Sequence, residues 1–97
     1  MTKKRERLEV IYDFLKIISD NDNSIKPTPL LRKTNLSSQS FSEYIDEMFA
    51  KGFIKSGTDK YGRKYITLTD KGFKYIERYK TILGFIDEFE LWFLFII

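Results

Sequence analysis

Apolar residues recur every three or four positions over residues 4–20, which predicts a first amphipathic helix. The turn-favouring residues 20–24 then end the helix. Residues 25–27 predict a short extended segment, because the residue before Pro27 avoids helical geometry. The helical stripe is wide enough to be covered on more than one side, and it consists of Leu8, Val10, Ile11, Phe14, Leu15, Ile17 and Ile18.

Between residues 28 and 54 the pattern predicts two helices joined by a polar turn. Thr28 places a capping residue ahead of Pro29 at the first helical position, so the first helix is expected over residues 29–34. The apolar stripe of the second helix consists of Phe41, Ile45, Met48 and Phe49. Gly52 stands where a helix needs a left-handed residue to end. This is the layout of a helix-turn-helix, although a simple pair of antiparallel helices has the same pattern.

A β-hairpin is predicted next, from apolar and β-branched residues at positions 53–58 and 64–69 around a polar loop with two glycines. Thr69 and Asp70 then predict the N-cap and first turn of a last helix. A helix-turn-helix followed at once by a hairpin is a winged helix, in which the hairpin loop forms the wing. The expected fold is therefore mainly α with a small β-hairpin: a winged helix-turn-helix with an extended C-terminal helix.

Composition removes most catalytic functions. The 97 residues are enough for one domain, and they include no cysteine and no histidine. Disulfides, thiolate or histidine metal sites and nucleophile–histidine catalysis are therefore excluded, and we expect neither an enzyme nor a cofactor. A basic N-terminus leads directly into an amphipathic segment, without the pattern of a signal peptide. The apolar run at residues 91–97 is far shorter than the roughly 20 residues that span a bilayer, so a cytoplasmic protein is expected.

Three strings of this sequence resemble the small archaeal winged-helix proteins of the ten-kilodalton Sulfolobus chromatin type. They are KRERLEVIYDFLKII, TPLLRKTNLSSQSFSEYIDEMFAKGFI and KYITLTDKGFKYIERY. The similarity extends in element order over about residues 4–90. It implies sequence-tolerant DNA binding and dimerisation through a long C-terminal helix. The chain departs from that family after Ile82, where the helix contains Gly84 and ends in an apolar run.

In the predicted helix-turn-helix, the start of the second helix carries small polar side chains that can enter a major groove. Gln39 in particular can pair with adenine, whereas Ser37 can instead be an N-cap and Ser40 can form a capping box with Glu43. The rest of the helix is acidic and contains no arginine, so only its start can enter the groove and weak sequence specificity is expected. The candidate base-contacting residues are Ser37, Ser38, Gln39, Ser40 and Ser42.

Positive charge is concentrated in two places, although the net charge is only +3. Residues 51–65 hold five bases against one acid, and residues 3–7 hold four bases against one acid. Such clusters are typical of phosphate contacts, although each is also compatible with an ordinary solvated surface. The candidate phosphate-contacting residues are Arg32, Lys33, Lys60, Arg63, Lys64, Lys3, Lys4 and Arg5.

Apolar positions in the last helix alternate at spacings of four and three, the heptad pattern of a coiled coil. This seam predicts a homodimer, and it consists of Tyr75, Tyr79, Ile82, Ile86, Phe89, Phe93 and Ile96. A second face, formed by Phe73, Ile76 and Leu83, is expected to pack on the core of the domain. The alternatives are a helix folded back over the first helix, or a tail at residues 91–97 that inserts its aromatics at a membrane surface.

The sequence therefore predicts a winged-helix DNA-binding domain at residues 1–72 and a dimerisation helix at residues 73–97 packed on it. Its partner would be double-stranded DNA, bound by a dimer that acts as a transcription regulator or as a chromatin-like architectural protein. Two other functions fit the same pattern. The acidic second helix suits a protein-interaction module, and the apolar C-terminus suits a membrane-associated regulator.

Overall fold

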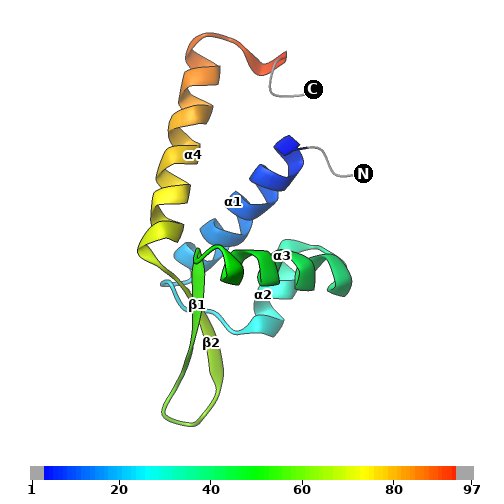
Figure 1. Cartoon of the computed structure of the whole chain (residues 1–97), viewed down its shortest axis with the longest axis vertical. Coiled ribbons are helices and arrows are strands. Elements are labelled where there is room, and N and C mark those ends of the chain that lie inside the picture. The colour runs from blue at the N-terminus through cyan, green and yellow to red at the C-terminus, as the bar shows by residue number, and fades with distance from the viewer. Residues whose placement is uncertain (1–3, 94–97) are drawn as a thin grey trace.

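The computed structural model describes residues 4–93 (Figure 1). The predicted winged helix-turn-helix is confirmed: three helices precede a two-stranded antiparallel hairpin, and a long helix follows it. The elements are α1 (Lys4–Asp20), α2 (Pro27–Thr34), α3 (Ser38–Ala50), β1 (Ile54–Thr58), β2 (Lys64–Leu68) and α4 (Asp70–Glu88). We define the wing as residues 59–64, which connect the two strands and include the first residue of β2.

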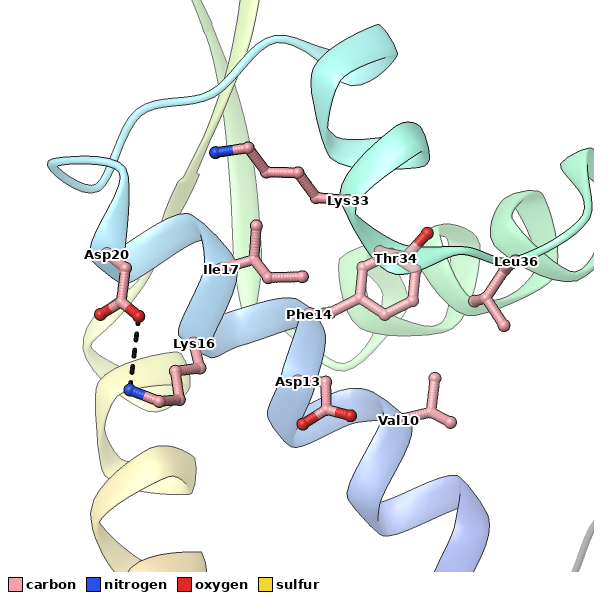
Figure 2. A pocket seen from close by; sticks show the side chains of 9 residues that line it. All are labelled: Val10, Asp13, Phe14, Lys16, Ile17, Asp20, Lys33, Thr34 and Leu36. Carbon is pink, nitrogen blue, oxygen red and sulfur yellow. Dashed lines mark hydrogen bonds and ion pairs between the residues drawn. The ribbon is translucent and has the colours of Figure 1, made fainter.

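Helix α2 begins two residues earlier than its sequence pattern predicts. Lys26 is extended, with φ −82° and ψ 153°, and Pro27 is the first helical residue. The expected cap by Thr28 is wrong, because Pro27 already has a helical φ and lacks the N–H that a cap would satisfy. Helix α2 ends at Thr34 and is followed by its C-cap, Asn35, whose φ of 61° is left-handed. Figure 2 shows Thr34 and Leu36, on either side of this turn, across from Phe14 of α1.

The predicted extended segment at residues 25–27 is confirmed for Ile25 and Lys26, as a single bridge, but it is wrong for Pro27, which begins α2. The Ile25 N–H donates to the Ile66 carbonyl at 3.1 Å, and the Ile66 N–H donates to the Ile25 carbonyl at 2.8 Å. Ile25 is buried and adjoins β2. The start of α2 is thereby fixed to the base of the wing.

Local capping positions helices α3 and α4. Ser37 caps α3, because its Oγ accepts the N–H of Ser40 at 3.2 Å. Ser40 thus lies in the first turn of α3, and the predicted capping box of Ser40 with Glu43 is wrong. Thr69 caps α4 in the same way, accepting the Gly72 N–H at 3.2 Å. Gly52 has φ 76°, as expected for the residue that ends α3.

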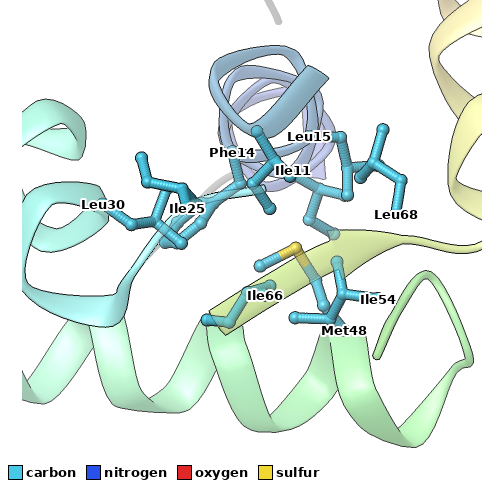
Figure 3. Close-up of a cluster of buried hydrophobic side chains, with 10 residues drawn as sticks. Ile11, Phe14, Leu15, Ile25, Leu30, Met48, Ile54, Ile66 and Leu68 are labelled. Atoms are coloured by element: carbon cyan, nitrogen blue, oxygen red, sulfur yellow. The ribbon is translucent and has the colours of Figure 1, made fainter. Parts of the chain in front are cut away.

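The core lies between α1, the helix-turn-helix and the inner face of the hairpin (Figure 3). Strand pairing places Ile54 opposite Leu68, so both point to the side that α1 covers. Each fully buried aliphatic or aromatic side chain stabilises the fold by about 1.5–3 kcal/mol. The buried cluster consists of Ile11, Phe14, Leu15, Ile18, Ile25, Leu30, Met48, Ile54, Ile66 and Leu68.

Helix α4 packs along α1 with the face that the heptad seam was expected to offer to a second chain. Tyr79 is 5% exposed and Ile86 is 8% exposed. The hydroxyl of Tyr75 donates to the carbonyl of Leu8 at 2.6 Å, and burial is the main reason why its pKa is raised. This face of α4 is therefore folded back over the first helix, which is one of the alternatives left open by the sequence.

The predicted seam is also wrong as one continuous helical stripe. Helix α4 ends at Glu88, and Glu90 has a left-handed φ of 54°, so Phe93 follows a turn. Ile96 lies outside the described residues. The expected second face is only partly correct, since Ile76 packs against the core but Phe73 is 43% exposed.

The wing and the C-terminal end of α4 lie at opposite ends of the molecule's long axis (Figure 1). The dimensions along the principal axes are 50 × 27 × 21 Å. Across the described residues, every helix is too short or too polar to pass through a bilayer.

Candidate nucleic-acid interface

The first two turns of α3 present three free polar side chains to solvent. Ser38, Gln39 and Ser42 are exposed, and they hydrogen-bond to no other described residue. Ser37 is exposed as well, but its Oγ is occupied by the cap, and Ser40 is partly buried. A helix N-terminus also carries a partial positive charge, which favours an approaching phosphate. Gln39 with its two neighbouring free serines is therefore the best placed of the predicted base contacts.

The acidic remainder of α3 is partly neutralised from α1, a contact that the sequence did not indicate. The guanidinium of Arg7 pairs with the carboxylate of Glu47 and lies 6.0 Å from the ring centroid of Tyr44. Glu43 and Asp46 remain exposed. Those two carboxylates repel phosphate, so α3 can approach DNA with its N-terminal end only.

Asp59 fixes the conformation of the wing. Its Oδ1 accepts the N–H of Tyr61 at 2.8 Å and the N–H of Arg63 at 2.9 Å. Its Oδ2 lies 3.3 Å from the Nε of Arg63. The pKa of Asp59 is lowered, first by the Arg63 N–H and then by the Tyr61 N–H and the charges of Arg63 and Lys26. Gly62, with φ 79°, completes the turn by donating its N–H to the Asp59 carbonyl at 3.0 Å.

Two cations of the wing flank one aromatic ring. The Nζ of Lys60 lies 5.2 Å from the ring centroid of Tyr61, and the Cζ of Arg63 lies 5.0 Å from it. Tyr61 itself is 68% exposed. Lys64 is exposed beside them at the start of β2. The wing is thus a fixed, cationic loop with an aromatic residue at its tip. Tyr61 was not among the predicted contacts, although the sequence places it between two bases, Lys60 and Arg63, in a loop that contains glycine.

Further cations lie in the last turn of α2 and just before its start. Arg32 and Lys33 are exposed, and the Nζ of Lys33 is 3.5 Å from the Oδ1 of Asn21. Lys26 was not among the predicted contacts. It is exposed, next to the residue that bridges to β2, and its charge reaches Asp59. Lys26 therefore belongs with the cations of the wing.

The N-terminal bases are not brought to this surface. Lys4 and Arg5 begin α1, whose first turn lies at the end of the molecule away from the wing (Figure 1). Lys3 lies outside the described residues. A DNA segment that contacts α3 and the wing would therefore not contact Lys4 and Arg5 at the start of α1.

A separate apolar surface lies at the end of α4. Ile82, Phe85 and Phe89 follow one another at spacings of three and four, so they share one face of the helix. Their side chains are 48%, 56% and 55% exposed, and the ring centroids of Phe85 and Phe89 are 4.9 Å apart. Trp92 and Phe93 follow the turn and are 41% and 61% exposed. We call these five residues the C-terminal apolar surface.

A winged helix-turn-helix family model matches residues 4–86. A curated relative, an uncharacterised protein of Methanocaldococcus jannaschii, is 40% identical over 58 residues. That alignment covers 60% of this chain and 58% of the relative. The chain thus spans less than two thirds of that relative's length.

Solved structures with the same fold include a DNA-binding protein and a transcription regulator. Sso10a-2, a DNA-binding protein from Sulfolobus solfataricus, has a TM-score of 0.67 at 16% identity, with 86% of this chain and 83% of that chain covered. MepR, a transcription regulator of a multidrug efflux pump of Staphylococcus aureus, has a TM-score of 0.73 at 17% identity, with 84% and 62% covered. The resemblance to the small archaeal winged-helix proteins is thereby confirmed.

Proposed function

The chain belongs to the winged helix-turn-helix family, and from this membership and its surface charges we propose that it binds duplex DNA in the cytoplasm. The observation that carries the proposal is the wing, where Asp59 fixes a loop that presents Lys60, Arg63 and Lys64. Lys60 and Arg63 are already held against Tyr61, so they lose less side-chain entropy when they bind a phosphate backbone. The free polar start of α3 supplies groups for base edges.

Sequence specificity is expected to be weak. Gln39 is the one side chain in the first turn of α3 that can make a bidentate contact, to adenine. Helix α3 has no arginine to read guanine, and its exposed Glu43 and Asp46 keep its later turns away from the groove. Phosphate contacts from the wing, Lys26, Arg32 and Lys33 would then supply most of the affinity. This balance suits an architectural protein or a regulator with a short recognition site.

We further propose that the protein is a homodimer joined at the C-terminal apolar surface. Exposed apolar residues gathered in one place are unusual on a monomer and are typical of an interface. Within the predicted seam, Ile82, Phe89 and Phe93 keep this role, whereas Tyr75, Tyr79 and Ile86 pack within their own chain. A partner at this end leaves both wings free, so one dimer would contact DNA at two places.

Gel-shift titrations on several unrelated duplexes at increasing salt test DNA binding. We expect binding at low salt, with log K falling by about 0.9 per phosphate contact for each unit of log salt. Replacing Lys60, Arg63 and Lys64 together by alanine should reduce that slope by about 2 to 3. Absence of binding at low salt would overturn the proposal.

The matched control for this experiment removes three exposed cations of α4, Lys74, Arg78 and Lys80, in the same way. Both variants lose the same net charge. The control is expected to keep nearly all of the affinity, because these residues lie outside the proposed surface. Equal losses in the two variants would mean that only net charge matters, and would remove the assignment to the wing.

A second function is favoured by one observation, the exposed acidic part of α3. Glu43 and Asp46 stand free in solvent near Phe49, which is 38% exposed. An acidic helix with an apolar residue suits a basic protein partner, in which case the winged helix would be a protein-interaction module. Binding of that protein partner would then persist when Lys60, Arg63 and Lys64 are replaced by alanine. It would be lost when the charges of Glu43 and Asp46 are reversed.

A further inference from the structure

A cavity of about 300 Å³ lies between α1 and the helix-turn-helix, and it shares only Lys33 with the proposed DNA surface. Figure 2 shows the side chains of α1 on one side and those of the end of α2 and the following turn on the other. The volume is at the lower end of the range of about 300–1,000 Å³ found for small-molecule sites. Its apolar wall is formed by Val10, Phe14, Ile17 and Leu36.

The charged groups at the rim do not balance locally. The Nζ of Lys16 lies 3.3 Å from the Oδ2 of Asp20, so these two charges compensate each other. Lys33 reaches the side-chain amide of Asn21 at 3.5 Å. Asp13, by contrast, hydrogen-bonds to no other described residue and forms no ion pair with one. Because the amide of Asn21 is neutral, Lys33 also keeps its charge, but its ammonium lies at the far end of the cavity from Asp13 (Figure 2). The charge that lines the cavity with Val10 and Phe14 is therefore the carboxylate of Asp13.

The surroundings of Asp13 favour an incoming cation. Partial burial, and then the nearby carboxylate of Glu9, raise the pKa of Asp13. Both causes penalise the charged form of the carboxylate. A ligand ammonium beside Asp13 would remove that penalty through a charge-assisted hydrogen bond, whereas a ligand anion would increase it.

We propose that this cavity binds a small apolar amine, with the ammonium on Asp13 and the apolar body against Val10, Phe14 and Ile17. The four apolar side chains supply the hydrophobic contacts, and the single carboxylate fixes the orientation, as in most small-molecule sites. The site is formed by one chain and does not depend on DNA. Its failure and the failure of the DNA-binding proposal are thus seen in different experiments.

Amide chemical-shift titration of the full chain, without DNA, tests this site. The probes are 2-phenylethylamine, neutral 2-phenylethanol and anionic 3-phenylpropionate, which share one aromatic body. We expect saturable shifts from the amine that centre on Val10, Phe14, Ile17 and Leu36. The amine should bind about tenfold more tightly than either of the others, because only it makes the charge-assisted contact.

The variant Asp13→Asn keeps the size of the side chain and removes its charge. We expect it to lower amine affinity about tenfold and to leave phenylethanol affinity unchanged. The control Asp46→Asn removes an exposed carboxylate of α3 outside the cavity and should change neither affinity.

Several results would overturn the proposal. They are amine shifts that spread evenly over the acidic surface, a preference for phenylpropionate, equal binding of all three probes, and unchanged amine affinity in Asp13→Asn. The comparison of the three probes uses the unaltered chain, so it decides the question even if the Asp13 variant does not fold.

Discussion

The ring of Tyr12 on α1 stacks on the ring of Tyr79 on α4, with centroids 4.6 Å apart and an angle of 25° between the planes. Tyr79 also stacks on Tyr75 of its own helix at 6.1 Å, and Tyr75 lies 5.3 Å from Phe53. This row of rings joins α1, α4 and the segment before β1. It fixes the direction in which α4 leaves the winged helix, and therefore the place where a second chain can attach.

Replacing Tyr79 by alanine should lower the free energy of unfolding by about 3 kcal/mol or more, the usual cost of removing a buried aromatic ring. Chemical denaturation with circular dichroism measures this change. The control is Tyr61→Ala, because Tyr61 is 68% exposed and should alter stability by less than about 0.5 kcal/mol. Similar losses in both variants would mean that the stacked row does not hold α4 in place.

Two glycines of α4 should respond to alanine in opposite directions. A Cβ at Gly72 would lie 2.3 Å from the backbone carbonyl oxygen of Phe53, which cannot move aside cheaply. A Cβ at Gly84 would meet no described atom within 4 Å. Alanine forms helix better than glycine by about 0.8–1 kcal/mol. Gly84→Ala should therefore raise the free energy of unfolding by up to about 1 kcal/mol.

Gly72→Ala should lower the free energy of unfolding by at least about 1 kcal/mol, since the clash outweighs the gain in helix propensity. Denaturant titrations of the two variants and the parent chain give both values on one scale. Stabilisation by both substitutions would show that α4 can shift away from Phe53 without loss.

The parts of the fold that depend on local chemistry were predictable from the sequence. Ser37 and Thr69 are good N-caps in isolation, and Gly52 is suited to a left-handed end, so these boundaries follow from a few neighbouring residues. The start of α2 was misplaced because two prolines, Pro27 and Pro29, both qualify for the first turn. Local preference alone does not choose between them.

The contacts between distant segments were not predictable. The heptad spacing of α4 correctly marks apolar faces, but spacing does not say whether Tyr79 meets Tyr12 of its own chain or a second chain. In the candidate DNA surface, the bases of the wing were identified from a cluster of charges. Lys26 was missed because only the bridge between Ile25 and Ile66 brings it close to the wing. Ile66 lies about 40 positions after Lys26 in the chain, so local sequence does not reveal this contact.

The conformation of the wing should depend on pH through Asp59. Its folded-state pKa lies below the ordinary value of 3.8, so ionised Asp59 stabilises the wing. That stabilisation is fully present above pH 3.8 and is lost as the pH falls through the lower, folded-state pKa. In an NMR titration the amide signals of Tyr61 and Arg63 should move together, with a midpoint below 3.8.

Asp59→Asn should abolish this transition and leave the other acid-induced shifts in place. The amide oxygen of asparagine can still accept both N–H groups, but the side chain lacks the charge that strengthens these bonds and attracts Arg63. We expect the variant to bind DNA more weakly at pH 7, despite its more positive net charge. Tighter binding by Asp59→Asn would instead mean that overall charge, and not the shape of the wing, governs affinity.

Association through the C-terminal apolar surface predicts the mass of the protein in solution. The parent chain should sediment as a dimer, whereas Phe89→Glu should sediment as a monomer, because a carboxylate cannot be buried there without a partner. Phe73→Glu is the matched control: Phe73 is also an exposed aromatic of α4, at 43%, but it lies at the other end of the helix. It should leave the dimer intact. A dimer that persists in Phe89→Glu, and in a chain truncated after Gly84, would remove this end of α4 as the interface.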